Sequence, residues 1–145
     1  MKIGFTCGVF DLTHAGHYLM FEECKKHCDY LIVGILTDPT IDRPEKNKPI
    51  QSIRERDIQV SACKWVDDTK YYDTEAHLYN YLKKNVDGIA VRFLGDDWAY
   101  KQYTGHDLPM KVMFCPRGHG YSSSSLRNRV VDGWKPPAGL QVGKI

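Results

Sequence analysis

The sequence has few of the features that mark a membrane, secreted or nucleic-acid-binding protein. Its longest apolar runs, such as Tyr30–Leu36, are far shorter than the ~20 residues that a membrane span needs. The formal net charge of +2 is too small to indicate a nucleic-acid partner by itself. The first residues lead directly into a strand-like run and lack the apolar stretch and cleavage site of a signal peptide. We therefore expect a cytoplasmic protein with neither a membrane nor a nucleic-acid partner.

The cysteines are odd in number and scattered, which argues against a disulfide framework and for a reducing compartment. They are Cys7, Cys24, Cys28, Cys63 and Cys115. Cys24 and Cys28 share one face of a predicted helix, whereas His27 lies off that face. No second ligand pair follows at the spacing of a zinc site. We therefore expect no metal held by the protein alone.

Strand and helix patterns alternate along the 145 residues, a length that suits one domain. Apolar runs predict strands at 2–7, 30–36, 89–94 and 111–115, and a short segment runs from Val66 toward Tyr71. Periodicity predicts helices at 14–28, 53–64, 75–84 and 125–131, the second with a capping box from Ser52 and Glu55. This order predicts a single-domain, Rossmann-like doubly wound α/β fold with a parallel sheet. We expect the domain at residues 1–132 and a C-terminal tail at 133–145.

Unusual polar residues follow the predicted strands, where ligands bind in open parallel sheets. The segments are Gly8 to His17, the polar loop 37–51 with Asp38, Lys46 and Lys48, the run Asp96-Asp97-Trp98, and Arg117 to Ser125. The 37–51 loop is long for a compact domain, and such loops are usually functional or mobile. We therefore expect a ligand site where these segments meet.

His14 and His17 stand three residues apart at the start of a predicted helix, so they lie on one face. Gly16 between them permits a close approach by a ligand, and the helix N-terminus offers free N–H groups. This pattern predicts a polyphosphate site in which two imidazoles donate hydrogen bonds to an α-phosphate that gains charge during transfer. A capping role for one histidine and a zinc pair are the alternatives.

The run RGHGYSSSSLR, which begins at Arg117, has a similar pattern. Its glycines permit turns, and its serine hydroxyls and N–H groups at the next helix start can hold phosphate oxygens. Arg117 and Arg127 supply positive charge in a geometry that suits phosphate. The alternative is a flexible serine-rich linker.

The segment GVFDLTHAGH, Gly8 to His17, resembles the HxGH signature of the nucleotidyltransferase superfamily. Further matching pieces are DYLIVGILTD (29–38), the Lys46–Lys48 loop leading to Arg54-Glu55-Arg56, WVDD (65–68), GDDW (95–98) and RGHGYSSSS (117–125). With these pieces in order, about Lys2 to Arg129 resembles the cytidylyltransferases, and among them glycerol-3-phosphate cytidylyltransferase.

The resemblance implies that an acceptor phosphate attacks the α-phosphorus of CTP in line and that magnesium pyrophosphate leaves. It also implies Mg²⁺ with the triphosphate, a small phosphorylated alcohol as acceptor, and a homodimer. The catalytic residues implied are His14, His17, Lys46 and Arg117. Those implied for the nucleotide are Gly8, Val9, Phe10, Asp11, Gly16, Asp97, Trp98, Arg117, Gly120, Tyr121, Ser122, Ser123 and Ser124. Those implied for the acceptor are Asp38, Lys46, Lys48, Arg56 and His77.

Two departures from this family keep a second substrate open. Gly118-His119 replace the Thr-Glu pair of its last motif, and the serine run before Leu126-Arg127 is similar to the ending of adenylyltransferases. Adenylyl transfer from ATP is therefore the alternative enzyme, and a non-catalytic nucleotide-binding module is the alternative from another class. The absence of G-x-G-x-x-G after the first predicted strand argues against a redox dehydrogenase.

Overall fold

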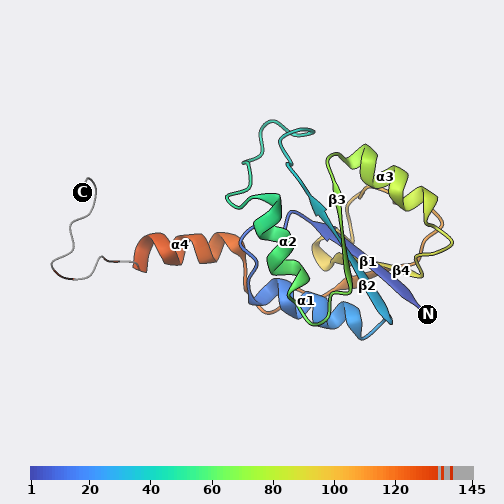
Figure 1. The fold of residues 1–145 in the computed structure, drawn as a ribbon, viewed down its shortest axis with the longest axis horizontal. Coiled ribbons are helices and arrows are strands. Elements are labelled where there is room, and N and C mark those ends of the chain that lie inside the picture. Colours follow the sequence, from blue (N-terminus) through green and yellow to red (C-terminus); the bar gives the residue numbers. More distant parts are fainter. Residues whose placement is uncertain (134, 136–137, 139–145) are drawn as a thin grey trace.

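The computed structural model describes residues 1–133, 135 and 138 and contains one parallel sheet (Figure 1). Its strands are β1 (Ile3–Gly8), β2 (Tyr30–Leu36), β3 (Asp68–Tyr72), β4 (Val91–Gly95) and β5 (Val112–Cys115). They stand in the order β3-β2-β1-β4-β5, and every neighbouring pair is parallel. This arrangement confirms the predicted Rossmann-like α/β fold.

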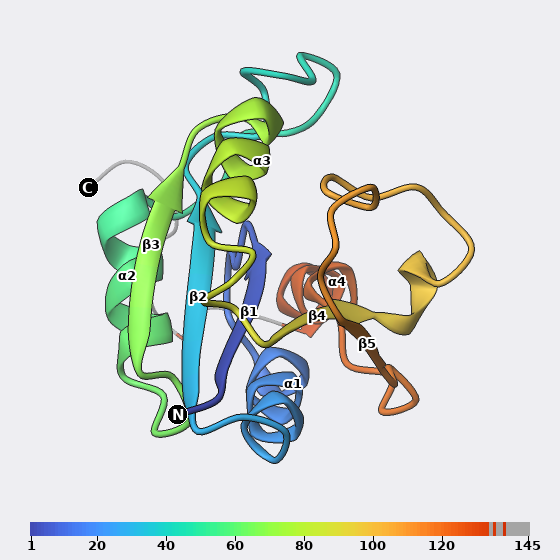
Figure 2. The same ribbon diagram turned by 90° about the vertical axis from the view of Figure 1, so that its right-hand side faces the viewer.

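Helices cover both faces of this sheet, as Figure 2 shows with α3 in front of the strands. The helices are α1 (Ala15–Lys25), α2 (Ile53–Ser61), α3 (Glu75–Lys84), the short 3₁₀ turn η1 (Asp96–Trp98) and α4 (Ser123–Gly133). Phe21 of α1 and Val60 of α2 belong to one buried cluster. Leu78 and Leu82 of α3 belong to the other, together with Phe5. The two clusters bury opposite faces of the strands, and this burial is the main favourable contribution to folding.

The sheet opens between β1 and β4, where the strand order reverses. β1 pairs with β2 along its whole length, from Ile3 to Gly8. It pairs with β4 only at two positions, Gly4 with Val91 and Phe5 with Arg92. The carboxyl ends of β1 and β4 therefore leave the ladder, and a crevice at such a point is where open α/β sheets bind ligands.

Several element ends differ from the sequence prediction because local hydrogen bonds set them. His14 caps α1 rather than lying inside it. The predicted capping box of α2 is present, with Glu55 N–H donating to Ser52 Oγ at 3.1 Å, but the helix ends at Ser61. α4 begins at Ser123, two residues early, because Ser122 Oγ accepts from the N–H of Ser125 at 3.1 Å.

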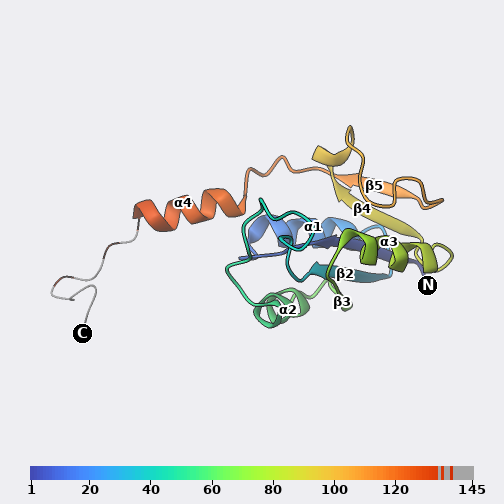
Figure 3. The same ribbon diagram turned by 90° about the horizontal axis from the view of Figure 1, so that it is seen from above.

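α4 runs away from the body of the domain (Figures 1 and 3). None of its residues is buried. Near its start, Ser123 Oγ donates to the Asp11 carbonyl at 3.5 Å, and Arg127 Nη2 lies 3.1 Å from Asp11 Oδ2. Gly133, expected in the tail, ends this helix, and residues 134, 136–137 and 139–145 of that tail lie outside the described residues. No helix in the described part of the chain is long and apolar enough to cross a membrane.

Candidate active site

The loop between β1 and α1 is held in a strained conformation. Phe10 has φ 53° and Leu12 has φ 52°, in the left-handed region that residues with side chains seldom adopt. The Asp11 carboxylate accepts from the N–H groups of Ile50 and Gln51, both at 2.9 Å, and Leu12 N–H donates to the Gln51 side chain at 2.8 Å. The 37–51 loop therefore braces this strained loop, and such strain concentrates at functional sites.

The Nδ1 atoms of His14 and His17 both accept hydrogen bonds from backbone N–H groups. His14 Nδ1 accepts from the N–H of Gly16 at 3.0 Å, and His17 Nδ1 accepts from the N–H of His14 at 3.2 Å. Each Nδ1 therefore carries no proton, so the proton of each neutral ring is on Nε2. The ring centroids are 4.0 Å apart. The pair presents two Nε2–H donors side by side at the start of α1.

Burial and neighbouring charge keep both rings neutral. Burial lowers the pKa of His17 from 6.5 to about 4, helped by the nearby His14, Arg117 and His119. Burial also lowers the pKa of His14, with further contributions from His119 and Arg117. At neutral pH both side chains are therefore uncharged hydrogen-bond donors.

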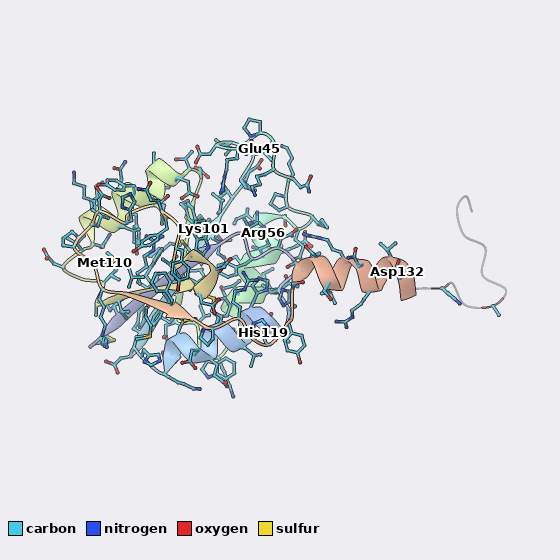
Figure 4. The ribbon with its side chains drawn as sticks, turned by 180° about the vertical axis from the view of Figure 1, so that it is seen from behind. Glu45, Arg56, Lys101, Met110, His119 and Asp132 are labelled. Atoms are coloured by element: carbon cyan, nitrogen blue, oxygen red, sulfur yellow. The ribbon has the colours of Figure 1, made fainter. Side chains whose placement is uncertain are left out.

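Gly16 is required by the packing of the imidazoles around it. A Cβ there would lie 2.9 Å from Cε1 of His14 and 2.9 Å from Cε1 of His119. His119 therefore stands beside the histidine pair, next to α1 (Figure 4), although no role was predicted for it. Its ring stacks on Tyr121 at a centroid distance of 5.4 Å, and its Nδ1 accepts from the N–H of Tyr121. Its position between two glycines of a motif expected to bind phosphate is the feature that could have identified it.

These imidazoles open into a cavity of about 180 Å³, which we call the histidine cavity. Its walls come from the ends of β1, β4 and β5 and the start of α1. Arg117 Nη1 lies 3.3 Å from Asp97 Oδ2 across one wall. The predicted site residues that line it are Phe10, His14, Gly16, His17, Asp97, Trp98, Arg117 and Tyr121.

A second, more positively charged cavity of about 670 Å³ adjoins the first, and we call it the lysine cavity. Phe10 and His17 line both cavities, so the two meet at the histidine pair. Lys48 Nζ lies 3.4 Å from Asp38 Oδ2, which places Asp38 at its edge. The predicted residues that line it are Val9, Phe10, Asp11, His17, Lys46, Lys48 and Ser123, and Arg43 and Arg127 complete its positive wall.

A third cavity of about 400 Å³ lies between β1, β4 and α3, and we call it the Arg92 cavity. It shares Cys7, Leu94 and Trp98 with the histidine cavity, and Val9 and Arg43 with the lysine cavity. Gly8 is a further predicted residue on its wall. The three cavities therefore surround the end of β1.

Two residues expected at the acceptor lie elsewhere. Arg56 is 1% exposed, near the middle of the molecule (Figure 4), and its guanidinium donates to four backbone carbonyls. These belong to Val9, Leu36, Thr37 and Gln51, at 2.6–3.2 Å. Arg56 thus fastens the loops after β1 and β2, and we assign it a positioning role rather than a contact with the acceptor.

The other displaced residue is His77 on α3. It lines a small cavity with Lys70 and Tyr71, and its Nδ1 accepts from the N–H of Asp73.

Three residues expected at the nucleotide also stand apart from the three cavities. Gly120 and Ser124 line none of them, and Ser122 faces a shallow groove beside Tyr121.

The carboxylates near the histidines are already engaged by the protein. Asp11 accepts from two N–H groups and Arg127, and Asp97 faces Arg117. Within the described residues no group of three or more His, Cys, Asp or Glu side chains could hold a metal ion. A Mg²⁺ bound by the phosphates of a nucleotide does not need such a group, so we assign no residue of this chain to it.

Comparisons with known proteins show which family this chain resembles. A family model described as cytidylyltransferase-like matches residues 5–129. The bifunctional protein HldE of Campylobacter jejuni subsp. jejuni is 31% identical over 134 residues, which are 90% of this chain and 28% of that protein. HldE of Hyphomonas neptunium is 30% identical over 138 residues, 92% of this chain and 28% of that protein. The chain thus spans little more than a quarter of the length of these relatives.

Solved structures share the fold. A lipopolysaccharide core biosynthesis protein from Thermoplasma volcanium superposes with a TM-score of 0.62 at 24% identity, over 80% of this chain and 95% of that one. A pantothenate synthetase from Thermus thermophilus superposes with a TM-score of 0.57 at 13% identity, over 80% of this chain and 56% of that one. The match over residues 5–129 shows that the chain belongs to the cytidylyltransferase-like family of nucleotidyltransferases.

Proposed function

We propose that this chain transfers a cytidylyl group from CTP to a small phosphorylated alcohol, with glycerol 3-phosphate as the first acceptor to test. An oxygen of the acceptor phosphate bonds to the α-phosphorus, and the bond from that phosphorus to the bridging oxygen of the β-phosphate breaks. Pyrophosphate leaves with the electron pair of that bond. The attacking oxygen is already anionic, so the step needs no general base.

The observation that carries this proposal is the pair of Nε2–H donors at the start of α1. Two neutral donors fixed by backbone hydrogen bonds suit the equatorial oxygens of a phosphorus centre that gains charge in the transition state. Lys46 and Lys48 line the adjoining cavity, where they would attract the other phosphates. Asp97, Trp98 and Arg117 also line the histidine cavity, where a base would stack and bond.

Adenylyl transfer from ATP is the second candidate. The serine run before Leu126 and Arg127 favours it, as does the replacement of the family's Thr-Glu pair by Gly118-His119. Cytosine and adenine both carry an exocyclic amino group that the Asp97 carboxylate could accept from. The choice of nucleotide is therefore the first question for experiment.

The test measures pyrophosphate release with CTP, ATP, GTP or UTP, Mg²⁺ and a panel of phosphate esters. We expect release with CTP and a product of the mass of a CDP-alcohol. Release with ATP alone would replace cytidylyl by adenylyl transfer. A rise in melting temperature with a nucleotide but no pyrophosphate from any ester would indicate a non-catalytic binding module.

Variants of the histidines test the mechanism. His17→Asn keeps an acceptor near the position of Nδ1 but removes the Nε2–H donor, so we expect kcat to fall by about 10²-fold or more. His27→Asn is the matched control, because His27 lies near the other end of α1 and contacts Glu23 at 3.2 Å. A kcat within threefold of wild type for His17→Asn would contradict the role of His17.

A further inference from the structure

Arg92 is a buried cation with few partners. It lies on β4 and is 3% exposed. Nη1 donates to the Thr104 carbonyl, the Tyr103 ring centre lies 5.2 Å from Cζ, and Nε has no hydrogen-bond partner. Within residues 1–133 no carboxylate oxygen lies within 4.0 Å of its guanidinium nitrogens. A buried charge without a counter-ion is costly.

The same chain shows how it satisfies a buried arginine that has only a structural task. Arg56 is as deeply buried as Arg92, and it also lacks a carboxylate within salt-bridge distance in the described residues. Four backbone carbonyls surround its guanidinium, so its donors are used. Arg92 has one such carbonyl. Its guanidinium therefore has spare donor capacity, and it lines the Arg92 cavity.

The wall of this cavity carries an excess of positive charge. Arg43 also lines it, and its Nε likewise has no hydrogen-bond partner. Glu75 is the single carboxylate on the wall. It lies 3.6 Å from Arg43 Nη2, and its other oxygen accepts from Thr104 Oγ1 at 2.8 Å. Two guanidinium groups and one carboxylate leave a net charge of one positive.

The other titratable groups on this wall do not neutralise that charge. Burial raises the pKa of the Cys7 thiol, which outweighs the attraction of Arg92 for its thiolate. Burial also raises the pKa of Tyr72, so its phenol stays protonated. Neither the thiol nor the phenol therefore adds a negative charge to this wall at neutral pH.

The position of the cavity connects it to the reaction. Cys7, Leu94 and Trp98 separate it from the histidine cavity, and Arg43 borders the lysine cavity. Its volume of about 400 Å³ suits the body of a small organic molecule. We infer that this cavity holds the part of the acceptor remote from its reacting phosphate, and that this part bears an oxyanion, a carboxylate or a second phosphate, which pairs with Arg92. The inference rests on the proposed function, and it favours acceptors with a second charge over glycerol 3-phosphate.

The test compares matched acceptors that differ only in this charge. The pairs are glycerol 3-phosphate with glycerate 3-phosphate, erythritol 4-phosphate with erythronate 4-phosphate, and glucitol 6-phosphate with gluconate 6-phosphate. In each pair a terminal CH₂OH becomes a carboxylate. We expect wild type to prefer the acid in at least one pair by about tenfold or more in kcat/KM, the size of one charge-assisted hydrogen bond.

Arg92→Met then separates recognition from a structural role. We expect it to abolish the preference for the acid, because kcat/KM falls much more for the acid than for the matched alcohol. We also expect its melting temperature without ligand to equal or exceed that of wild type, because an apolar side chain removes a buried, poorly paired charge. Arg92→Lys should keep part of the preference. Arg54→Met, on the exposed face of α2, is the control that should change nothing.

Each outcome bears on the inference. Equal use of acids and alcohols by wild type, or an undiminished preference in Arg92→Met, overturns it while the proposed function stands. If no acceptor is turned over, the proposed function fails, and calorimetric titration of the same six esters decides the inference alone. Binding of an acid that weakens about tenfold in Arg92→Met supports it, and no binding, or binding unaffected by Arg92→Met, overturns it.

Discussion

The neutral state of His17 makes a quantitative prediction about stability in acid. Its pKa is about 4 in the folded chain against an ordinary value of 6.5, with burial as the main cause. Because the folded pKa is depressed, the unfolded chain binds the proton first as pH falls. The contribution to stability is therefore fully present above pH 6.5 and is lost progressively as pH falls from 6.5 toward 4.

The magnitude follows from the two pKa values. At 1.36 kcal/mol per pKa unit the full loss is about 3 kcal/mol, reached near and below pH 4. At pH 5 the loss is about 2 kcal/mol, and at pH 7 it is close to zero. His14 adds a loss of the same sign, since its pKa is lowered too.

The assay is urea unfolding at pH 7 and pH 5 for wild type and His17→Asn. The variant keeps an acceptor for the His14 N–H but cannot take up a proton. We expect wild type to lose about 2 kcal/mol more than the variant between the two pH values. Phe21→Leu, an apolar change in the core, is the control and should lower stability by the same amount at pH 7 and pH 5. The reasoning is refuted if wild type and His17→Asn lose stability in parallel.

Three further predictions concern Gly16, Arg56 and the oligomeric state. Gly16→Ala should lower kcat by about tenfold or more, because the added Cβ would displace the rings of His14 and His119. Gly118→Ala is the control and should leave kcat unchanged, because a Cβ at Gly118 would have no atom within 4 Å. Arg56→Met should cost about 3 kcal/mol or more in urea unfolding, because four carbonyls lose their donor. An unchanged unfolding midpoint would contradict that role. The homodimer implied by the family predicts a dimer mass in sedimentation at micromolar concentration, and a single species of monomer mass would contradict it.

The part of the site that the sequence could predict is the part that local structure creates. His14 and His17 lie within one turn, so their shared face follows from helix geometry, and the structure places them together. The parallel sheet follows from the alternation of strands and helices, because parallel strands need crossovers. The start of α1 is also set locally, since the His14 side chain caps the helix, although the sequence prediction placed His14 inside it.

The part that could not be predicted depends on contacts between distant segments. The motif predicts that Arg56 contacts a phosphate, but its partners are carbonyls at the end of β2 and in the loops after β1 and β2, which only the folded sheet brings together. Arg92 lies within an otherwise apolar strand. That sequence pattern alone does not show that the Arg92 side chain is buried or that it lacks a counter-ion. Its position on a cavity wall follows from the divergence of β1 and β4 after two paired positions. The hydrophobic periodicity of the sequence does not determine how many residues of β1 and β4 pair.

On the proposed function, the neutral state of the two histidines has a mechanistic consequence. Only an interaction that is stronger in the transition state than in the ground state raises kcat. Neutral Nε2–H donors bind the ground state more weakly, and their hydrogen bonds strengthen as the equatorial oxygens gain charge. The burial that lowers the pKa of His17 therefore serves the reaction, although it costs stability in acid. Lys46 and Lys48 lie in the neighbouring cavity, where their charge can act on the remaining phosphates and the leaving group.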